Sequence, residues 1–459
     1  MSPLWTAREI AEAVGGRVHG DFEAAGIAFD SREIGPGDLF VAMKGEATDG
    51  HLFLDKAYAA GAAGAIVSEA AAGPHVLVAD TTRALNDLGR AARARCRGKI
   101  VGVTGSVGKT GTKEALFAAL ERCTPGRAHR SVKSYNNHTG VPLSLARMPK
   151  ATRFGIFEMG MNHEGELAAL TRLVRPHVAV VTTIAPAHRE YFASDADIAD
   201  AKGEIFQGLE PGGTAIIPYD SPHLNRLAAA ARPHAGRIVT FGMDEGADVR
   251  AAYVIRGPKG GSLVTAQLPA GQLSFTVSQP GAHWVANALA VLAAVEAVGG
   301  DLALAGLALG ELGGLKGRGE RHLIGLDGGE ALLIDESYNA NPASMAATLK
   351  VLGEEKVAGR RIAVLGAMRE LGEDSEDFHA ALADPLEHAH VDYAILVGTE
   401  MEALAKALGG QVKMAHVPDA TAAIPLARAA IGPGDAMLVK GSNSIGLAAL
   451  VEALAGGTD

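Results

Sequence analysis

The chain has 459 residues, of which 48% are hydrophobic and 20% are charged, and its formal net charge at pH 7 is -10. This length predicts about three domains, and the composition is typical of a globular protein rather than a disordered one. The acidic balance argues against a general nucleic-acid-binding protein. The two cysteines offer no disulfide framework, and neither a signal peptide nor an apolar run of about 18 residues is present, so we expect a cytoplasmic protein.

Residues 1–82 predict a small α/β domain. Thr6 is placed to cap a helix that begins at Ala7 and stops at Gly15-Gly16. The turn GPGD at residues 35–38 precedes an apolar strand, and a second helix and strand follow. A helix from Thr81 to Cys96 then leads into the next domain.

Residues 83–312 alternate apolar strands with helices, which predicts a central, mostly parallel sheet covered on both faces. Within this domain, residues 248–277 alternate in a way that predicts antiparallel strands, and an alanine-rich helix ends at Gly299-Gly300. Residues 313–459 form a further βα series, which predicts a Rossmann-like third domain. We expect the glycine-rich segment 313–322 to be the hinge into it. The predicted fold class is therefore α/β, in three domains.

The glycine-rich segment GVTGSVGKTGTKE, residues 102–114, lies between an apolar run and a helix-like stretch. Strand, glycine loop and helix is the arrangement that presents backbone N–H groups to phosphates. The usual P-loop glycine falls at Val103, and Gly102 stands one place further out. We expect Lys109 to reach the β and γ phosphates of ATP or GTP and Thr110 to coordinate Mg²⁺. The residues expected to surround the phosphates are Gly105, Ser106, Val107, Gly108, Lys109, Thr110 and Gly111.

Three later segments carry polar side chains near this loop. Glu158 ends the strand FGIFEMG, and His188 follows the strand VAVVTTI. Lys202 falls about two turns into a helix that Ser194 is placed to cap. Singly, each has an ordinary explanation: an acid facing solvent, a histidine that caps a turn, an ion-paired lysine. Because the loops of one parallel sheet converge on the same rim, Glu158, His188 and Thr110 together are candidate metal ligands.

The loop with Asn136, Asn137 and Thr139 can offer amide donors to substrate phosphates, or can simply form a turn. Asn287 lies one helical turn after His283, where an amide can bind an adenine edge or cap a helix.

The hinge segment and the strand after it supply two further candidates. Arg318 could reach a phosphate across a cleft, and Asp335 could accept hydrogen bonds from ribose hydroxyls. Each of these signals is weak by itself.

Taken in order, these segments resemble the Mur ligase family over essentially the whole chain. The family's ATP loop also places its first glycine where Gly102 stands. AKGEIF and DESYNANP are most similar to the members that join D-alanyl-D-alanine to UDP-N-acetylmuramoyl-tripeptide. The segments in family order and spacing are DSREIGPGDLFVAMKGEATDGH, VTGSVGKTGTKE, NNHTGVPLSL, EMGMNHEGEL, AHREYF, AKGEIF, GAHWVANALA, DESYNANPASM, LGAMRELGEDS and LVKGSNS.

The resemblance implies an ATP-dependent amide ligase that works through an acyl phosphate and releases ADP and phosphate in cytoplasmic peptidoglycan precursor synthesis. It implies Lys109, His188 and Lys202 as catalytic residues. Lys202 corresponds to a lysine that is carbamylated in several members of the family, where it would hold Mg²⁺ together with Thr110, Glu158 and His188. It leaves the base that deprotonates the amine unassigned. A monomer is expected, without nucleic acid as a partner.

The resemblance also distributes the substrates over the domains. Asn287, Arg318 and Asp335 correspond to contacts with the adenine, phosphate and ribose of ATP. The remaining residues that the resemblance places near the UDP-linked substrate or the metal are Ser31, Arg32, Asn136, Asn137 and Thr139.

The chain departs from the family pattern at four positions. Ala367 and Asn443 stand where the family has Asp and Arg, Glu336 stands for a second Asp, and Trp284 replaces an Asn. The first two lie in the third domain and concern the incoming dipeptide.

The alternatives are another Mur-type ligase (adding diaminopimelate or lysine), a folylpolyglutamate synthase, and a nucleotide-dependent binding switch that hydrolyses without ligation.

Overall fold

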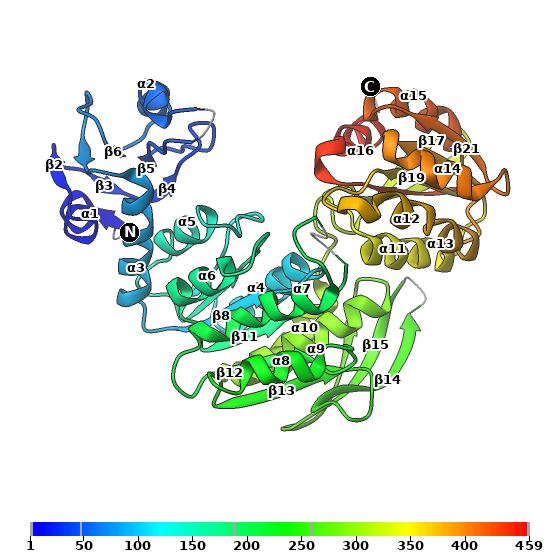
Figure 1. Ribbon diagram of the computed structural model, residues 1–459, viewed down its shortest axis with the longest axis horizontal. Helices are drawn as coiled ribbons and strands as arrows, with labels where there is room; N and C mark the ends of the chain where they lie inside the picture. Colours follow the sequence, from blue (N-terminus) through cyan, green and yellow to red (C-terminus); the bar gives the residue numbers. More distant parts are fainter. Residues whose placement is uncertain (1–2, 46–47, 187–189, 258–259, 457–459) are drawn as a thin grey trace.

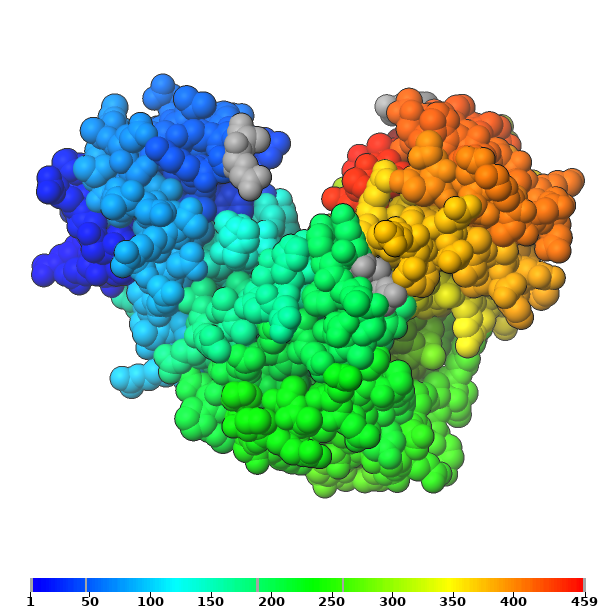
Figure 2. Space-filling view, in the orientation of Figure 1, coloured from blue at the N-terminus to red at the C-terminus, as the bar shows by residue number. Residues whose placement is uncertain are grey.

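The computed structural model describes residues 3–45, 48–186, 190–257 and 260–456. Its helices and strands form three bodies in chain order, each built on its own sheet (Figure 1). The N-terminal and C-terminal bodies stand on opposite sides of the central one and leave a broad hollow between them (Figure 2). The predicted α/β fold class is confirmed.

The N-terminal sheet has the order β2-β7-β6-β5-β4, with β4 to β7 parallel. The predicted helix cap is confirmed: the Thr6 hydroxyl accepts from the N–H of Glu9, and the Glu9 carboxylate accepts from the N–H of Thr6. The elements are β1 (Trp5–Thr6), α1 (Ala7–Val14), β2 (Arg17–His19), β3 (Glu23–Ala24), β4 (Gly26–Ala28), β5 (Asp38–Val41), a 3-10 turn (Gly50–Phe53), α2 (Leu54–Ala59), β6 (Gly64–Val67) and β7 (His75–Leu77).

Helix α3 (Thr81–Arg95) joins the N-terminal sheet to the central body. Its Leu85 and Leu88 belong to a buried apolar cluster that also takes in Leu143 and Ala146 of α5 (Gly140–Ala146). The indole N–H of Trp5 donates to the carbonyl oxygen of Ala146 at 2.9 Å. A continuous apolar core therefore fastens the first body to the second.

The central sheet has the order β16-β15-β14-β13-β12-β11-β8-β10-β9. It is parallel from β14 to β9 and ends in the predicted antiparallel strands. Its strands are β8 (Lys99–Thr104), β9 (Ala128–Arg130), β10 (Phe154–Glu158), β11 (Val178–Val181), β12 (Thr214–Pro218), β13 (Arg237–Gly242), β14 (Val249–Gly257), β15 (Gly260–Leu268) and β16 (Gly271–Val277).

Helices cover both faces of this sheet because successive side chains of each strand point to opposite sides. In β8, Val101 and Val103 join the cluster with α4, α9 and α10, whereas Ile100 joins the cluster on the other face. The helices are α4 (Lys109–Cys123), α5, α6 (Glu166–Val174), α7 (Asp195–Gly203) with a 3-10 turn (Glu204–Gly208), α8 (Leu224–Ala231), α9 (Ala282–Ala297) and α10 (Leu302–Glu311).

The C-terminal sheet has the order β17-β18-β22-β19-β20-β21 and is parallel except for β17. Strand β17 corrects the sequence analysis, which took Glu320–His322 as hinge. Its elements are β17 (Glu320–Leu326), β18 (Gly329–Glu336), α11 (Pro342–Glu354), β19 (Arg361–Gly366), a 3-10 turn (Gly372–Asp374), α12 (Ser375–Ala380), α13 (Ala383–His388), β20 (Tyr393–Val397), a 3-10 turn (Thr399–Met401), α14 (Glu402–Leu408), β21 (Lys413–Val417), α15 (Ala420–Ala430), β22 (Ala436–Lys440), a 3-10 turn (Asn443–Ile445) and α16 (Ala448–Ala455).

The carboxyl ends of β8 and β10 lie side by side, since Glu158 pairs with Val103 in the parallel register. In sheets of this kind ligands bind outside the carboxyl ends of the strands. Within the described ranges, no helix has both the length and the apolar character needed to cross a membrane.

Candidate active site

The loop between β8 and α4 has the conformation that its glycines allow. Gly105 has φ +149°, and a Cβ built on it would lie 1.9 Å from the Thr182 hydroxyl oxygen, so no larger residue fits. Gly108 has φ +89° and directly precedes the first turn of α4. The predicted succession of strand, glycine loop and helix is confirmed, and the loop opens at a helix N-terminus, where anions are favoured.

Lys109 folds back over this loop. Its ammonium donates to the carbonyl oxygen of Gly105 at 2.6 Å and lies 3.5 Å from that of Ser106. Burial lowers the pKa of Lys109, and the nearby Glu158 charge opposes this shift. A desolvated cation at a helix N-terminus is suited to binding a phosphate.

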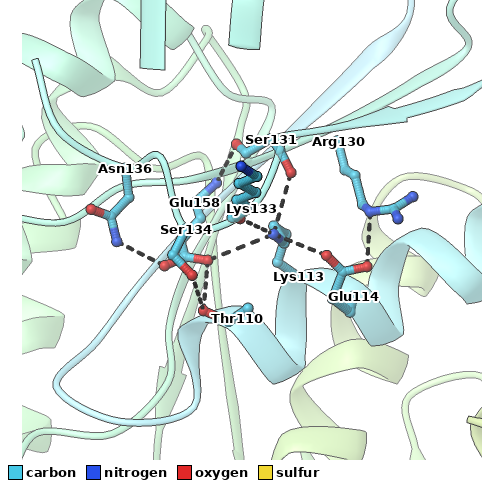
Figure 3. A network of polar contacts seen from close by, with 9 residues as sticks. All are labelled: Thr110, Lys113, Glu114, Arg130, Ser131, Lys133, Ser134, Asn136 and Glu158. Atoms are coloured by element: carbon cyan, nitrogen blue, oxygen red, sulfur yellow. Dashed lines mark hydrogen bonds and ion pairs between the residues drawn. The ribbon is translucent and has the colours of Figure 1, made fainter. Parts of the chain in front are cut away.

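Glu158 lies at the centre of the site and its side chain is only 1% exposed. The hydroxyl of Thr110 donates to its Oε2 at 2.9 Å, and the side-chain amide of Asn136 donates to its Oε1 at 2.8 Å (Figure 3). The hydroxyls of Thr110 and Ser134 are 3.4 Å apart. The structure thus confirms that Thr110 and Glu158 lie together, and it adds Asn136, which the sequence analysis proposed separately.

Lys202 is in the last turn of α7, whose predicted N-cap Ser194 accepts from the N–H of Asp197 at 3.2 Å. The Lys202 side chain is completely buried, and its Nζ has no hydrogen-bond partner among the described residues. Burial, together with repulsion from Lys109, lowers the pKa of Lys202 well below its usual value. Burial without a partner favours the neutral amine over the ammonium, and a neutral amine is nucleophilic.

Residues of the third body face the loop across a cleft. Arg318 borders three adjoining cavities, of which the one with Lys109 and Arg369 has a volume of about 400 Å³ and the one with Tyr135 and Tyr338 about 370 Å³. The guanidinium of Arg318 lies 4.3 Å from the centre of the Tyr338 ring. Arg318 is therefore in the position across a cleft that the sequence suggested.

Asn287 lies on the central side of the same cleft. A Cβ built on Gly108 would approach its amide oxygen to 2.8 Å, so the amide packs directly on the loop. Trp284, on the same helix, packs over Gly111. Together these side chains form one wall of a smaller cavity of about 140 Å³.

Asp335 is buried at the hinge. Its carboxylate accepts from the N–H of Gly317 at 2.8 Å and from the N–H of Ser337 at 3.0 Å. The side chain therefore fastens the turn that carries Arg318. Its predicted contact with ribose stays a prediction.

The other predicted residues are less closely connected. Arg32 is exposed and pairs with Asp30, where its side chain holds the pKa of that carboxyl at about 2. The side chain of Asn137 accepts from the hydroxyl of Thr139 at 3.0 Å and closes a local turn. Ser31 lies in the turn that leads to Arg32. His188 lies outside the described residues.

Three family models match the chain. They are described as Mur ligase family, catalytic domain (residues 23–96), Mur ligase middle domain (residues 103–295), and Mur ligase, glutamate ligase domain (residues 317–443). The UDP-N-acetylmuramoyl-tripeptide--D-alanyl-D-alanine ligase of Escherichia coli (strain K12) is 35% identical over 457 residues, with 98% of each chain covered. The chain belongs to the Mur ligase family.

Solved Mur ligase structures have the same fold. MurF from Acinetobacter baumannii superposes with a TM-score of 0.84 and 32% identity, covering 98% of this chain and 99% of that one. MurF from Thermotoga maritima, in complex with ADP, superposes with a TM-score of 0.77 and 26% identity, covering 94% and 97%. The family assignment therefore holds over all three bodies of this chain.

Sequence reasoning missed one charged group in this Mur ligase. Lys113, one turn after Thr110, is completely buried, 3.0 Å from Glu114 and 3.9 Å from Glu158. A lysine next to a glutamate in a helix usually lies on a solvated surface. The helical spacing could have indicated that Lys113 faces the site, because residues three apart lie on the same face of a helix and Thr110 was already predicted to face the site.

Proposed function

We propose that this chain is an ATP-dependent ligase that joins D-alanyl-D-alanine to UDP-N-acetylmuramoyl-tripeptide in peptidoglycan precursor synthesis. One observation carries the choice of substrates: the similarity to a ligase of that name extends over 98% of both chains, at 35% identity. The chain therefore has a counterpart for every substrate-bearing part of that relative. The fold and the buried set around Glu158 support ATP use.

In this proposal the loop from Gly105 to Thr110 holds the ATP phosphates, and Lys109 contacts the γ phosphate. The ammonium now bonded to the Gly105 carbonyl would turn to the phosphate when ATP binds. Asn287 and Arg318 would contact adenine and phosphate from the two sides of the cleft, and Asp335 would contact ribose. The packing of the Asn287 amide directly on Gly108 supports this arrangement.

The residues around Glu158 fit Mg²⁺. A buried carboxylate and the Thr110 hydroxyl are the oxygen donors that Mg²⁺ prefers. The orphaned, completely buried amine of Lys202 becomes a further oxygen donor if CO₂ carbamylates it. Thr110, Glu158 and carbamylated Lys202 would hold the metal, with His188 as an additional ligand. Bound Mg²⁺ would neutralise charge on the transferring phosphoryl group.

The reaction needs two steps, because an amide does not form spontaneously from a carboxylate and an amine in water. The carboxylate oxygen of the tripeptide bonds to the γ phosphorus while the bond to ADP breaks. The amine nitrogen of D-alanyl-D-alanine then bonds to the acyl carbon, phosphate leaves, and the amine proton passes to a base. Lys109 stabilises the charge that develops on the phosphoryl oxygens.

We further propose that the three domains, residues 1–82, 83–312 and 313–459, each bind a different substrate. The first holds the UDP end near Ser31 and Arg32, the second holds ATP, and the third brings the dipeptide. Asn136, Asn137 and Thr139 would border the peptide of the first substrate. Closure about the part of the hinge that precedes β17, residues 313–319, would exclude water from the acyl phosphate. The enzyme is proposed to act as a cytoplasmic monomer.

The test is a reconstituted ligation. Purified protein is incubated with ATP, Mg²⁺, UDP-N-acetylmuramoyl-tripeptide and D-alanyl-D-alanine, and ADP release is measured alongside the mass of the nucleotide product. We expect one ADP per ligated product, and no ADP when either substrate is omitted.

An acceptor panel separates the alternatives. Diaminopimelate, lysine and glutamate replace the dipeptide, with the corresponding shorter UDP-linked or folate substrate. Preference for a single amino acid would overturn the choice of substrates. ADP release that requires neither substrate would indicate a nucleotide-dependent switch.

A further inference from the structure

The loop of residues 131–136, here called the junction loop, lies where all three bodies approach one another. It follows β9 and leads toward α5. Ser134 and Asn136 contact Thr110 and Glu158, as described above. Lys133, Ser134 and Tyr135 also line the cavity of about 370 Å³ that Arg318 borders.

Lys113 anchors this loop from the side of the sheet. Its ammonium donates to the carbonyl oxygen of Lys133 at 2.6 Å and to that of Ser131 at 3.2 Å (Figure 3). Ser131 in turn accepts from the N–H of Glu158 at 3.1 Å. Glu114 completes the charge balance, since its second oxygen lies 2.8 Å from Arg130. One buried cation thus fixes both the backbone of the loop and the strand end that carries Glu158.

The backbone that Lys113 holds is strained. Lys133 has φ +51°, in the left-handed region that residues with a side chain rarely adopt. Such a conformation persists only where the surroundings over-determine it. The short charge-assisted bond from Lys113 to the Lys133 carbonyl supplies that restraint. Without it the loop would relax to another conformation.

Glu33 of the N-terminal body anchors the loop from the opposite side. Its carboxylate pairs with the Lys133 ammonium and accepts from the Tyr135 hydroxyl at 2.7 Å. The Tyr135 ring also packs on Phe29, with 5.7 Å between ring centres. Arg32, beside Glu33, is the residue proposed to lie near the UDP end of the substrate.

The polar contacts of Glu33 are not what joins the first two bodies. The apolar core between α3 and α5 does so, and the Phe29 and Tyr135 rings pack against that core. The Lys133 side chain is 60% exposed, and an exposed ion pair contributes little to stability. The polar contacts therefore set the position of the loop rather than the attachment of the domain.

We propose that Glu33 and Lys113 are positioning residues for the ligation, which hold the junction loop between the domain that binds the UDP end and the end of β10. The loop then keeps Asn136 on Glu158 and Ser134 beside Thr110, so that the carboxylate of the UDP-linked peptide meets the γ phosphate in line. This inference rests on the proposed function. It assigns roles to two residues that contact neither ATP nor the reacting carboxylate.

The test compares Glu33→Gln and Lys133→Met with a matched Lys–Glu pair within the N-terminal body. Lys44 and Glu69 are also an exposed Lys–Glu pair, 2.8 Å apart, and Lys44→Met and Glu69→Gln serve as controls. We expect Glu33→Gln and Lys133→Met each to lower kcat about tenfold, with KM for ATP and for the UDP-linked substrate changed less than about threefold. The kcat of the double variant should be no lower than that of the less active single variant. The kcat of each control should equal that of wild type.

Lys113→Met tests the other anchor. We expect kcat to fall by about 100-fold while the affinity for ADP, measured by calorimetry, stays within about threefold. The reason is that the described partners of the Lys113 ammonium, which are Ser131, Lys133, Glu114 and Glu158, all lie outside the phosphate loop. Should this buried substitution prevent folding, the Glu33 and Lys133 variants decide alone. A kcat within about twofold of wild type in both, or a loss carried entirely by KM, would overturn the positioning role. A wild-type chain that fails to ligate would overturn the proposed function as well.

Discussion

Thr110 and Glu158 share a hydrogen bond of 2.9 Å, although 48 residues separate them in the chain. The parallel pairing of β8 and β10 produces this contact, because it sets Glu158 beside Val103 at the same end of the sheet. The first turn of α4 then brings the Thr110 hydroxyl over the carboxylate. The phosphate loop and the acid are thus two parts of one site, in which the hydroxyl and the carboxylate can share a cation.

Glu158→Gln tests this shared site. Glutamine keeps the size of the side chain and can still bond with Asn136, but it lacks the negative charge that a metal requires. We expect kcat to fall by about 100-fold or more, with a higher Mg²⁺ concentration needed for half-maximal rate. The measurement is phosphate release under saturating substrates across a Mg²⁺ titration.

Glu245→Gln is the control for this substitution, since Glu245 is an exposed residue of a surface turn. An unchanged Mg²⁺ dependence in Glu158→Gln would show that Glu158 is not a ligand of the proposed Mg²⁺.

Lys109→Met should abolish ATP turnover. The substitution keeps an apolar stem of similar length and removes the cation that contacts the γ phosphate in the proposed function. We expect ADP release to fall by about 1000-fold, because a preorganised charge acts most strongly in an enclosed site. Lys99→Met, at the exposed start of β8, the strand that precedes the phosphate loop, should retain normal turnover. Near-normal ADP release by Lys109→Met would contradict the phosphate-loop assignment.

The sequence was informative where a local rule applied. The capping residues Thr6 and Ser194 and the strand-loop-helix at Gly105 follow from short patterns, and each is present in the structure. Glu158 could be placed at the site because parallel strands end at one edge. Asn136 was named as a candidate near the substrate or the metal, but its hydrogen bond to Glu158 could not be predicted, since the contact depends on how the junction loop folds.

The parts that escaped prediction depend on contacts distant in sequence. The first three residues of β17 were assigned to the hinge because they follow a glycine-rich segment, and only the pairing with β18 makes them part of a strand. The spacing of Lys113 from Thr110 places both on one face of α4, but its hydrogen bonds to the carbonyl oxygens of Ser131 and Lys133 could not be predicted, since any sequence provides such carbonyls. Likewise, the carboxylate of Asp335 fastens backbone N–H groups of the hinge, a role that a motif does not reveal.

His177 makes the stability of the central domain depend on pH. Burial, with nearby Arg93 and Lys99 charges, lowers the pKa of His177 from 6.5 to about 4. Its Nδ1 accepts from the N–H of Ile100 at 3.0 Å, a bond that protonation of this nitrogen breaks. Between pH 6.5 and about 4 the unfolded chain therefore binds a proton that the folded chain does not, so stability falls as the pH is lowered through this window.

His177→Asn should weaken this dependence, because asparagine can still accept from Ile100 and does not titrate. The measurement is the free energy of unfolding in urea at several pH values between neutral and about 4.5. His234→Asn, at an exposed position, should leave the slope unchanged. Other histidines, such as the half-buried His129 with a pKa of about 4, preserve part of the pH dependence of stability in both variants. Equal slopes in wild type and His177→Asn would show that His177 is protonated in the folded protein.

Lys202→Ala distinguishes a carbamate from a simple lysine. The Nζ of Lys202 is completely buried and has no partner among the described residues, and burial lowers its pKa well below the usual value. A neutral amine of this kind reacts with CO₂, and the carbamate that forms is a carboxylate-like oxygen donor. Removing the side chain should lower kcat by about 100-fold or more, through loss of that donor and of the charge it carries.

Short carboxylic acids should then restore part of the activity, because the space left by the lysine admits a carboxylate at the position of the carbamate. The ligation rate of Lys202→Ala is measured in acetate or propionate against chloride at equal ionic strength. Lys109→Met, assayed in the same buffers, should gain nothing, since it lacks a cation rather than an oxygen donor. Full activity of Lys202→Ala without added acid would show that the ligation needs no carbamate, whereas a low rate that no carboxylic acid improves would favour a role for the amine itself.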